Sequence, residues 1–181
     1  MNTSRINKDA CEKLKLPTLV SVVRKSVVEV LSRPASELEG HQAFKSHHKL
    51  LALWATDCAE HVLSYFEEKY PNDGRPRKAI EVCRTWVATG EFKMAVIRGA
   101  SLNAHAAARE AQDAAARYAA RSAGQAVATA HVPTHSIGAA VYAIKAAAAY
   151  SGNLDDGLVN ERNWQLQRLI EYTKQGTMQL F

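Results

Sequence analysis

Residues 100–131 read ASLNAHAAAREAQDAAARYAARSAGQAVATAH, and about half of these positions are alanine. Alanine has the highest helix propensity, and no proline interrupts residues 91–131. A single helix of that length would extend about 60 Å, which is too long for a compact domain of this size. We therefore expect two helices with a break at Gln112-Asp113, where Asp113 would cap the second helix. Gly99 is the alternative position for the break.

Small side chains on these two helices predict close helix packing. The small residues that recur at helical spacing are Ala104, Ala107, Ala108, Ala111, Ala116, Ala119, Ala123, Gly124 and Ala126. Such faces allow helix axes to approach to the lower end of the usual range of roughly 8–10 Å. Because alanine buries little area, we expect large aromatic side chains to contribute much of the hydrophobic stabilisation, namely Trp54, Tyr65, Trp86, Tyr142 and Trp164.

The rest of the chain also has the pattern of helices. Apolar residues recur at helical spacing, and alternating β-branched runs closed by turn signals are absent. The spacing predicts further helices at about 17–33, 47–70, 76–89, 135–150 and 158–175. The polar segments 35–46 and 151–157 are expected to form a linker and an exposed loop. The predicted fold class is all-α, a single-domain helical bundle of about seven helices.

Charge is distributed unevenly between the two ends of the chain. Of the 23 Lys/Arg and 18 Asp/Glu residues, seven and three lie in residues 1–33, so the remaining body is close to neutral. We therefore expect residues 1–40 to form an N-terminal basic helix and linker extension, and residues 41–181 to form the helical bundle domain. The basic segment lacks the interleaved aromatic residues of a single-strand binding platform, which argues against nucleic acid as a partner.

Cysteine usage and hydropathy indicate the cellular compartment. The three cysteines Cys11, Cys58 and Cys83 are widely spaced and form no Cys-x-x-Cys pair, which is typical of a reducing environment. The N-terminus has no apolar signal-peptide core, and no apolar run approaches the roughly 20 residues of a membrane span. We expect a cytoplasmic protein that does not associate with membranes.

Two histidines, His131 and His135, lie four positions apart on either side of Pro133. On one regular helix they would share a face with good geometry for a metal ion. Proline lacks an N–H group and restricts the residue before it, so we expect a helix to end at His131 and Thr134 to cap the next helix. The preferred interpretation is a structural corner, with a polar functional pocket and metal ligation as alternatives.

Further polar residues could join these histidines in a candidate pocket. Asp57 and His61 are one helical turn apart, so the carboxylate could accept a hydrogen bond from the imidazole, as in an acid–base pair or in a structural border pair. His105 and Arg109 begin an i,i+4 series that the break at Asp113 would divide. The full candidate polar pocket comprises Asp57, His61, His105, Arg109, His131 and His135.

Arg75 and Arg77 flank Pro76 at a predicted helix start. Backbone N–H groups point outward there and could hold an anion together with the guanidinium groups, so both arginines are candidate anion contacts. The alternative is that they are ordinary exposed turn residues.

Motifs for known chemistry are absent from the sequence. It contains no Glu-x-x-His pair of a di-iron bundle, no His-Glu-x-x-His, no phosphate-binding glycine loop and no Gly-x-Ser-x-Gly. Cys58 and Cys83 lie on apolar faces, which does not favour an activated thiol. We therefore expect no catalytic residue, no cofactor and no metal ligand.

Three stretches together carry a family resemblance. They are LALWATDCAEHVLSYFEEKYPNDGRPRKAIEVCRTW, LNAHAAAREA and AARSAGQAVATAHVPTHSIGAAVYAIKAA, and they cover roughly residues 47–150. In order and wording they resemble a bacterial family of helical immunity proteins assigned to polymorphic-toxin systems. The resemblance implies a cytoplasmic, non-enzymatic protein that binds and neutralises a cognate protein toxin.

Three functional hypotheses follow from the residues and the resemblance. The first is a toxin-neutralising binding protein that needs no cofactor. The second is a helical-bundle enzyme or metal-binding protein in which Asp57, His61, His131 and His135 converge. The third is an oligomerising module whose alanine faces pair between identical subunits, which leaves a homo-oligomer as a possible assembly.

Overall fold

The computed structural model describes residues 40–152 and 154–176, and the elements in these ranges are helices. They are α3 (Gly40–His61), α4 (Ser64–Glu67), α5 (Arg75–Thr89), α6 (Met94–Glu110), α7 (Ala114–Ala128), α8 (His135–Tyr150) and α9 (Leu154–Gly176). The predicted all-α fold is confirmed, with six helices of at least 15 residues and the four-residue α4 in the described part. The basic helix expected at 17–33 lies outside the described residues. None of the described helices is long and apolar enough to cross a membrane.

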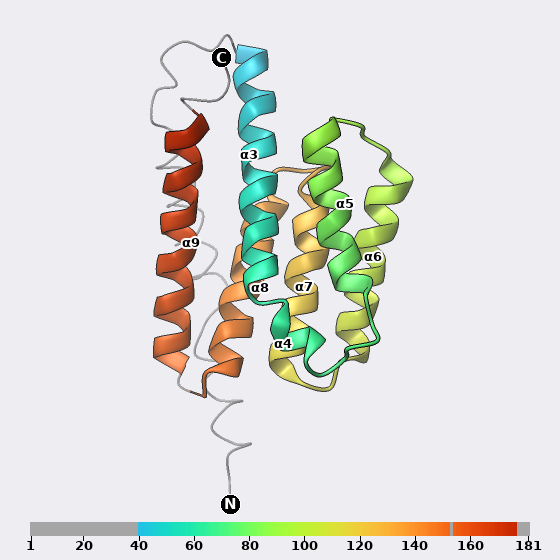
Figure 1. Cartoon of the computed structure of the whole chain (residues 1–181), viewed down its shortest axis with the longest axis vertical. Coiled ribbons are helices and arrows are strands. Elements are labelled where there is room, and N and C mark those ends of the chain that lie inside the picture. The colour runs from blue at the N-terminus through green and yellow to red at the C-terminus, as the bar shows by residue number, and fades with distance from the viewer. Residues whose placement is uncertain (1–39, 153, 177–181) are drawn as a thin grey trace, which may run out of the picture.

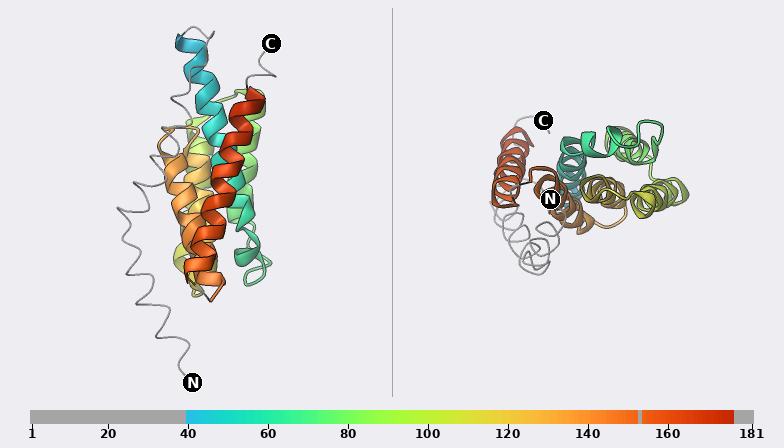
Figure 2. Two further views of the ribbon diagram at one scale, coloured as in Figure 1. Left: turned by 90° about the vertical axis from the view of Figure 1, so that its left-hand side faces the viewer. Right: turned by 90° about the horizontal axis from the view of Figure 1, so that it is seen from below.

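The six long helices form two layers of three. Helices α9, α3 and α5 lie side by side in one layer, and α8, α7 and α6 form the other (Figures 1 and 2). Within this arrangement α3 packs on α7 and α8, and α5 packs on α6 and α7. The central helices α3 and α7 therefore contact helices of both layers, and together with α8 they supply most of the buried alanine and aliphatic residues.

The break in the alanine-rich segment lies where the sequence predicts it. Helix α6 ends at Glu110, and the Asp113 carboxylate accepts a 2.8 Å hydrogen bond from the backbone N–H of Ala116 at the start of α7. Arg117 donates from Nε to the carbonyl of Ala111 at 3.1 Å, which satisfies a backbone acceptor at the end of α6. Gly99 lies inside α6 and causes no break.

Small residues fill the buried faces of α6 and α7, as expected. The buried set includes Ala104, Ala107, Ala108, Ala111, Ala116, Ala119, Ala123, Gly124 and Ala126. Trp54 and Trp86 are also buried, and the indole Nε1 of Trp54 donates to the backbone carbonyl of Gln165 at 2.8 Å. The alanine faces are covered within one chain, so they are not available for the pairing between subunits that the third hypothesis requires.

Several predicted helix boundaries are wrong. Helix α3 begins at Gly40, inside the segment expected to be a linker, and α9 begins at Leu154, inside the expected loop. The helix predicted to run to residue 70 ends at His61, where i→i+3 hydrogen bonds such as Leu63 N–H to the carbonyl of Glu60 (3.1 Å) separate α3 from α4. The expected linker and the expected loop contain few apolar residues, so the sequence around Gly40 and Leu154 shows little of the apolar periodicity that predicts a helix.

Candidate functional site

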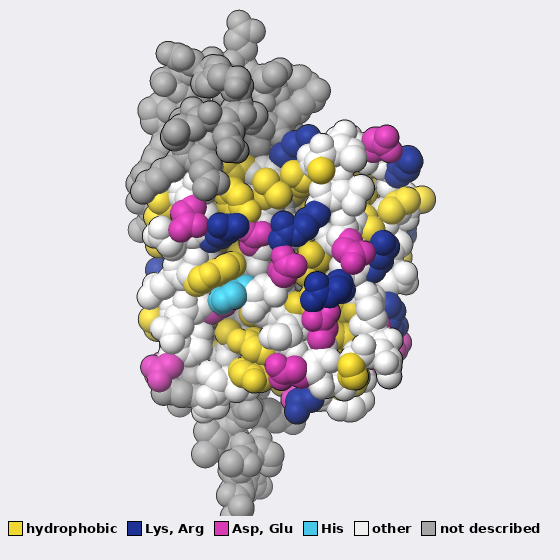
Figure 3. Space-filling model, in the orientation of Figure 1, with side chains coloured by type: hydrophobic (Ala, Val, Ile, Leu, Met, Phe, Trp, Pro, Cys, Tyr) yellow, Lys and Arg dark blue, Asp and Glu magenta, His cyan; other side chains and the backbone are white. Residues whose placement is uncertain are grey.

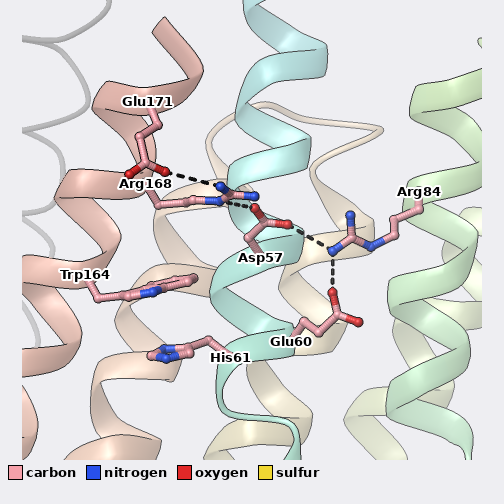
Figure 4. Close-up of a pocket in the computed structure, with 7 residues that line it drawn as sticks. All are labelled: Asp57, Glu60, His61, Arg84, Trp164, Arg168 and Glu171. Carbon is pink, nitrogen blue, oxygen red and sulfur yellow. Dashed lines mark hydrogen bonds and ion pairs between the residues drawn. The ribbon is translucent and has the colours of Figure 1, made fainter. Parts of the chain in front are cut away.

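A shallow, open cleft of about 350 Å³ lies where α3 meets α5 and α9. Its lining residues are Asp57, Glu60, His61, Arg84, Trp164, Arg168 and Glu171 (Figure 4). On the face of the molecule seen in Figure 3, basic and acidic side chains are interspersed rather than separated by sign. The cleft is therefore a mixed-charge surface.

Asp57 on α3 is the centre of this cleft and is only 7% exposed. Its Oδ1 accepts a 2.9 Å hydrogen bond from Nη2 of Arg84 on α5. Its Oδ2 accepts from Nε of Arg168 and from the hydroxyl of Tyr172, both on α9 and both at 2.6 Å. One carboxylate thus connects three helices through charge-assisted hydrogen bonds, which are about twice as strong as neutral ones.

The arginines that contact Asp57 are also bound by carboxylates at the rim of the cleft. Arg84 donates to Glu60, and Arg168 donates from Nη1 to Glu171 at 3.2 Å. Hydrogen bonding to Asp57 raises the pKa of the Arg168 guanidinium above its usual range, and burial together with Asp57 raises the pKa of Tyr172 to about 12. Both guanidinium groups stay charged, and their charges are neutralised within the chain.

His61 forms a second polar pair beside this network. Its Nδ1 donates to Oε2 of the buried Glu161 at 2.8 Å, and this hydrogen bond raises the pKa of the imidazole. The ring stacks on the indole of Trp164, with centroids 3.8 Å apart and planes within 10°. Gln165 donates from Nε2 to Oε1 of Glu161 at 2.8 Å and orients that carboxylate.

The predicted hydrogen bond between Asp57 and His61 is wrong, although both residues line the cleft. Residues one turn apart on a helix can meet, but both carboxylate oxygens of Asp57 are taken by groups from α5 and α9. His61 instead pairs with Glu161, which lies 100 positions away in the sequence. Tertiary partners with full charge therefore displaced the local pair.

The cleft contains no activated thiol. Burial raises the pKa of Cys58 well above its usual value, and the negative charges of Glu161 and Asp57 raise it further. Burial also raises the pKa of Cys83 to about 11. Both sulfurs therefore remain protonated near neutral pH and behave as small core side chains.

His105 and Arg109, two further members of the predicted pocket, lie on α6 and do not line the cleft. The His105 ring lies against Gly124 of α7, and its buried Nδ1 has no hydrogen-bond partner among the described residues. Burial is the main cause that lowers the pKa of His105 to about 4, and the positive charges of Arg121 and Arg109 add to it. The imidazole is therefore neutral at physiological pH.

The remaining two members, His131 and His135, form a corner. Helix α7 ends at Ala128, three residues before the predicted end, and α8 begins at His135. His131 is exposed, and His135 donates from Nδ1 to Oε1 of Gln125 at 2.7 Å. Thr134 has the cap position of α8 but makes no capping hydrogen bond. This geometry supports the structural interpretation of the histidine pair.

Arg75 and Arg77 are not free to bind an anion. Arg75 donates from Nη2 to Asp73 at 2.7 Å and also contacts Glu110, and Arg77 donates from Nη2 to Glu67 at 2.7 Å. The Asp73 carboxylate also accepts the backbone N–H of Arg75 at 3.1 Å. The chain's own carboxylates therefore occupy the positions where an external anion would bind.

The six predicted pocket residues thus separate into different parts of the fold. Asp57 and His61 line the cleft, His105 and Arg109 lie on α6, and the other two lie at the α7–α8 corner. Among the described residues, no group of three or more His, Cys, Asp or Glu side chains could hold a metal ion. The second hypothesis required Asp57, His61, His131 and His135 to converge, and they do not.

Sequence reasoning missed the residues that α5 and α9 contribute to the cleft. These are Arg84 of α5 and Glu161, Trp164, Arg168, Glu171 and Tyr172 of α9. Glu161, Arg168 and Tyr172 recur at intervals of seven and four positions, which places them on one side of a helix. A polar stripe of this kind on an otherwise half-apolar helix is the signal that could have found them.

A comparison with known protein families identifies the family to which this sequence is similar. Residues 42–172 match the family described as Imm-5 like putative immunity protein, in agreement with the resemblance of the sequence motifs. Neither the curated proteins nor the solved structures provide a match. The matched span runs from the first turn of α3 to Tyr172 of α9 and so includes every residue of the cleft. The chain therefore belongs to the family of Imm-5 like putative immunity proteins.

Proposed function

We propose that this protein binds a cognate bacterial toxin in the cytoplasm and neutralises it stoichiometrically, without catalysis and without a cofactor. Membership of an immunity protein family provides the class of partner. The observation that carries the non-catalytic part is the pairing within the cleft. Each charged residue that lines the cleft has a partner of opposite charge in the same chain.

Internal pairing of this kind favours a rigid surface over a reactive one. A general acid or base must reach a substrate atom at hydrogen-bond distance, and a nucleophile needs a base beside it. Asp57 has both oxygens occupied, and the buried Cys58 thiol is held in its protonated form. Three helices joined through one carboxylate form a stiff scaffold, which reduces the ordering cost of binding a partner.

The experiment is a titration against the toxin encoded beside the gene for this protein. A stoichiometric inhibitor abolishes toxin activity at a ratio of 1:1 and elutes with the toxin as a 1:1 complex. Protection of growing cells should likewise depend on equimolar expression. If no product of a neighbouring gene binds the purified chain, the proposed function is wrong.

An enzyme that inactivates the toxin is the second candidate, because His61 and Glu161 have the geometry of an acid–base pair. Such an enzyme would act at substoichiometric amounts and would lose activity in the variant His61→Gln. A binding protein keeps 1:1 inhibition in the same variant. The two candidates are therefore separated by the stoichiometry of inhibition and by the effect of this one substitution.

A further inference from the structure

Arginines without acidic partners gather on the edge of the molecule formed by α6 and α7. Arg98 and Arg109 on α6 are exposed, and Arg121 on α7 is half-buried. Among the described residues, no carboxylate pairs with any of these three. Arg84 and Arg168 of the cleft differ from them, because each of those is bound by two carboxylates.

Acidic residues are nearly absent from this part of the chain. Between Met94 and Tyr150 the sequence contains two, Glu110 and Asp113. Glu110 is paired with Arg75 of α5, and Asp113 caps α7 through the N–H of Ala116. The α6–α7 edge therefore keeps an excess of positive charge, although the charge of Glu110 also acts on the neighbouring Arg109.

Exposed apolar side chains alternate with the cationic ones along α6. The spacing places five residues in one line on the helix, the α6 stripe: Met94, Arg98, Leu102, His105 and Arg109. Met94 and Leu102 are 42% and 54% exposed. His105 lies flat against Gly124 at the base of the stripe, so Arg121 of α7 stands beside it. Arginine and apolar side chains with few acids are the composition of a protein interface core.

Unpaired arginines contribute more to binding than paired ones. A carboxylate of a partner that meets Arg98 or Arg109 has no internal carboxylate to displace, whereas at Arg84 it would compete with Asp57 and Glu60. Fixed unpaired charge also accelerates encounter with a surface of opposite sign. The cleft is therefore the less suitable of the two surfaces for an acidic partner.

We propose that the α6 stripe, together with Arg121, is the surface that binds the toxin, and that the toxin presents an acidic surface with an apolar centre. The partner's carboxylates pair with Arg98, Arg109 and Arg121, and its apolar residues cover Leu102 and Met94. This inference rests on the proposed function for the identity of the partner. A protein fits better than a nucleic acid, because the stripe has no Phe, Tyr or Trp on which bases could stack.

The test compares two double variants that change the net charge equally. Arg98→Glu/Arg109→Glu reverses two charges in the stripe, and Lys69→Glu/Arg162→Glu reverses two exposed cations elsewhere. We expect the first to weaken the Kd for the toxin at least about tenfold, the size of a lost hot spot, and the second to leave it nearly unchanged. Equal weakening by both, or by neither, would overturn the proposal.

A second readout does not depend on the toxin. An oligoglutamate peptide titrated at low salt should bind the native chain and the Lys69→Glu/Arg162→Glu control, and should lose binding to Arg98→Glu/Arg109→Glu. If the peptide behaves in this way but no toxin binds, the surface is supported and the proposed function fails. If a short DNA duplex binds more tightly than the peptide at the same salt concentration, the partner of this surface is a nucleic acid and the proposal is overturned.

Discussion

His105 of α6 lies so close to Gly124 of α7 that a Cβ atom on residue 124 would stand 2.7 Å from Cε1 of the imidazole. The absence of a side chain at this position allows the ring to lie between the two helices. The contact holds the imidazole against α7, and it removes Nδ1 of His105 from solvent.

The substitution Gly124→Leu should destabilise the protein by about 1–3 kcal/mol, because the added side chain overpacks the contact with His105. Gly99→Leu is the matched control, since residue 99 lies in α6 and a Cβ built there meets no packing neighbour within 4 Å in the described part of the chain. The control should be neutral or stabilise by up to about 1 kcal/mol through helix propensity. Chemical denaturation of both variants measures the difference, and equal free energies of unfolding would contradict the prediction.

The half-buried imidazole of His105 should make stability depend on pH in the acid range. Its pKa falls from 6.5 in the unfolded chain to about 4 in the folded one, so the unfolded state binds the proton more readily. The contribution of the neutral ring is present above pH 6.5 and is lost as the pH falls toward 4. The variant His105→Gln should lose less stability than the native chain between these values.

The variant His61→Gln is the control, because the contribution of His61 to stability should change with pH in the opposite direction to that of His105. The hydrogen bond to Glu161 raises the pKa of His61, so its contribution is present below pH 6.5 and is lost as the pH rises through the raised pKa. Thermal melts of native chain and variants at several pH values provide the comparison. Parallel curves for native chain and His105→Gln would show that residue 105 is not buried as described.

The cap at Asp113 should be worth about 1 kcal/mol, within a usual range of about 0.5–2 kcal/mol, because its carboxylate accepts the N–H of Ala116. Thr134 has the equivalent position at the start of α8 but makes no capping hydrogen bond. We therefore expect Asp113→Ala to lower the free energy of unfolding clearly and Thr134→Ala to change it by less than about 0.5 kcal/mol. An equal loss in both variants, measured by urea denaturation, would be inconsistent with this difference in capping.

Asp57→Asn should be the most damaging of the conservative changes in the cleft. It removes the charge that both Arg84 and Arg168 contact, and breaking a fully buried pair costs about 3–5 kcal/mol. Because these guanidinium groups are 41% and 37% exposed and can regain water, we expect about 2–3 kcal/mol. Glu171→Gln at the exposed rim should change stability by less than about 0.5 kcal/mol. A loss below about 1 kcal/mol for Asp57→Asn would mean that the carboxylate does not hold the three helices together.

The cores of the helices and their apolar faces were predictable from the sequence, whereas several of their ends were not. The division at Asp113 follows from helix length and capping, and Cys58 and Cys83 are buried on the apolar faces that the sequence indicates. The helical starts at Gly40 and Leu154 were missed, because polar segments carry little periodic signal. The sequence predicts a corner between two helices at Pro133 from the chemistry of proline, and the structure has this corner.

The candidate site was predictable only in part. Asp57 and His61 were identified from their chemistry and spacing, but their partners on α9 lie between 100 and 115 positions away. The further partner of Asp57, Arg84 of α5, lies 27 positions away. Arg75 and Arg77 looked available for an anion, because Glu110 and Glu67 are brought to them only by the fold. The other partner of Arg75, Asp73, lies two positions before it and could have been recognised from the sequence. A charged side chain in a sequence does not reveal whether a distant residue neutralises it.

The sequence by itself determined that the chain forms closely packed helices with small faces and few reactive groups, because helix propensity, capping and periodicity act within about four residues. Only the tertiary structure decided which charges are neutralised and which remain open to a partner. The reason is physical: ion pairs form between side chains that packing brings within a few ångströms, and the layered arrangement of α3, α5 and α9 does this for Asp57 but leaves Arg98 and Arg109 of α6 without such a neighbour in the described chain.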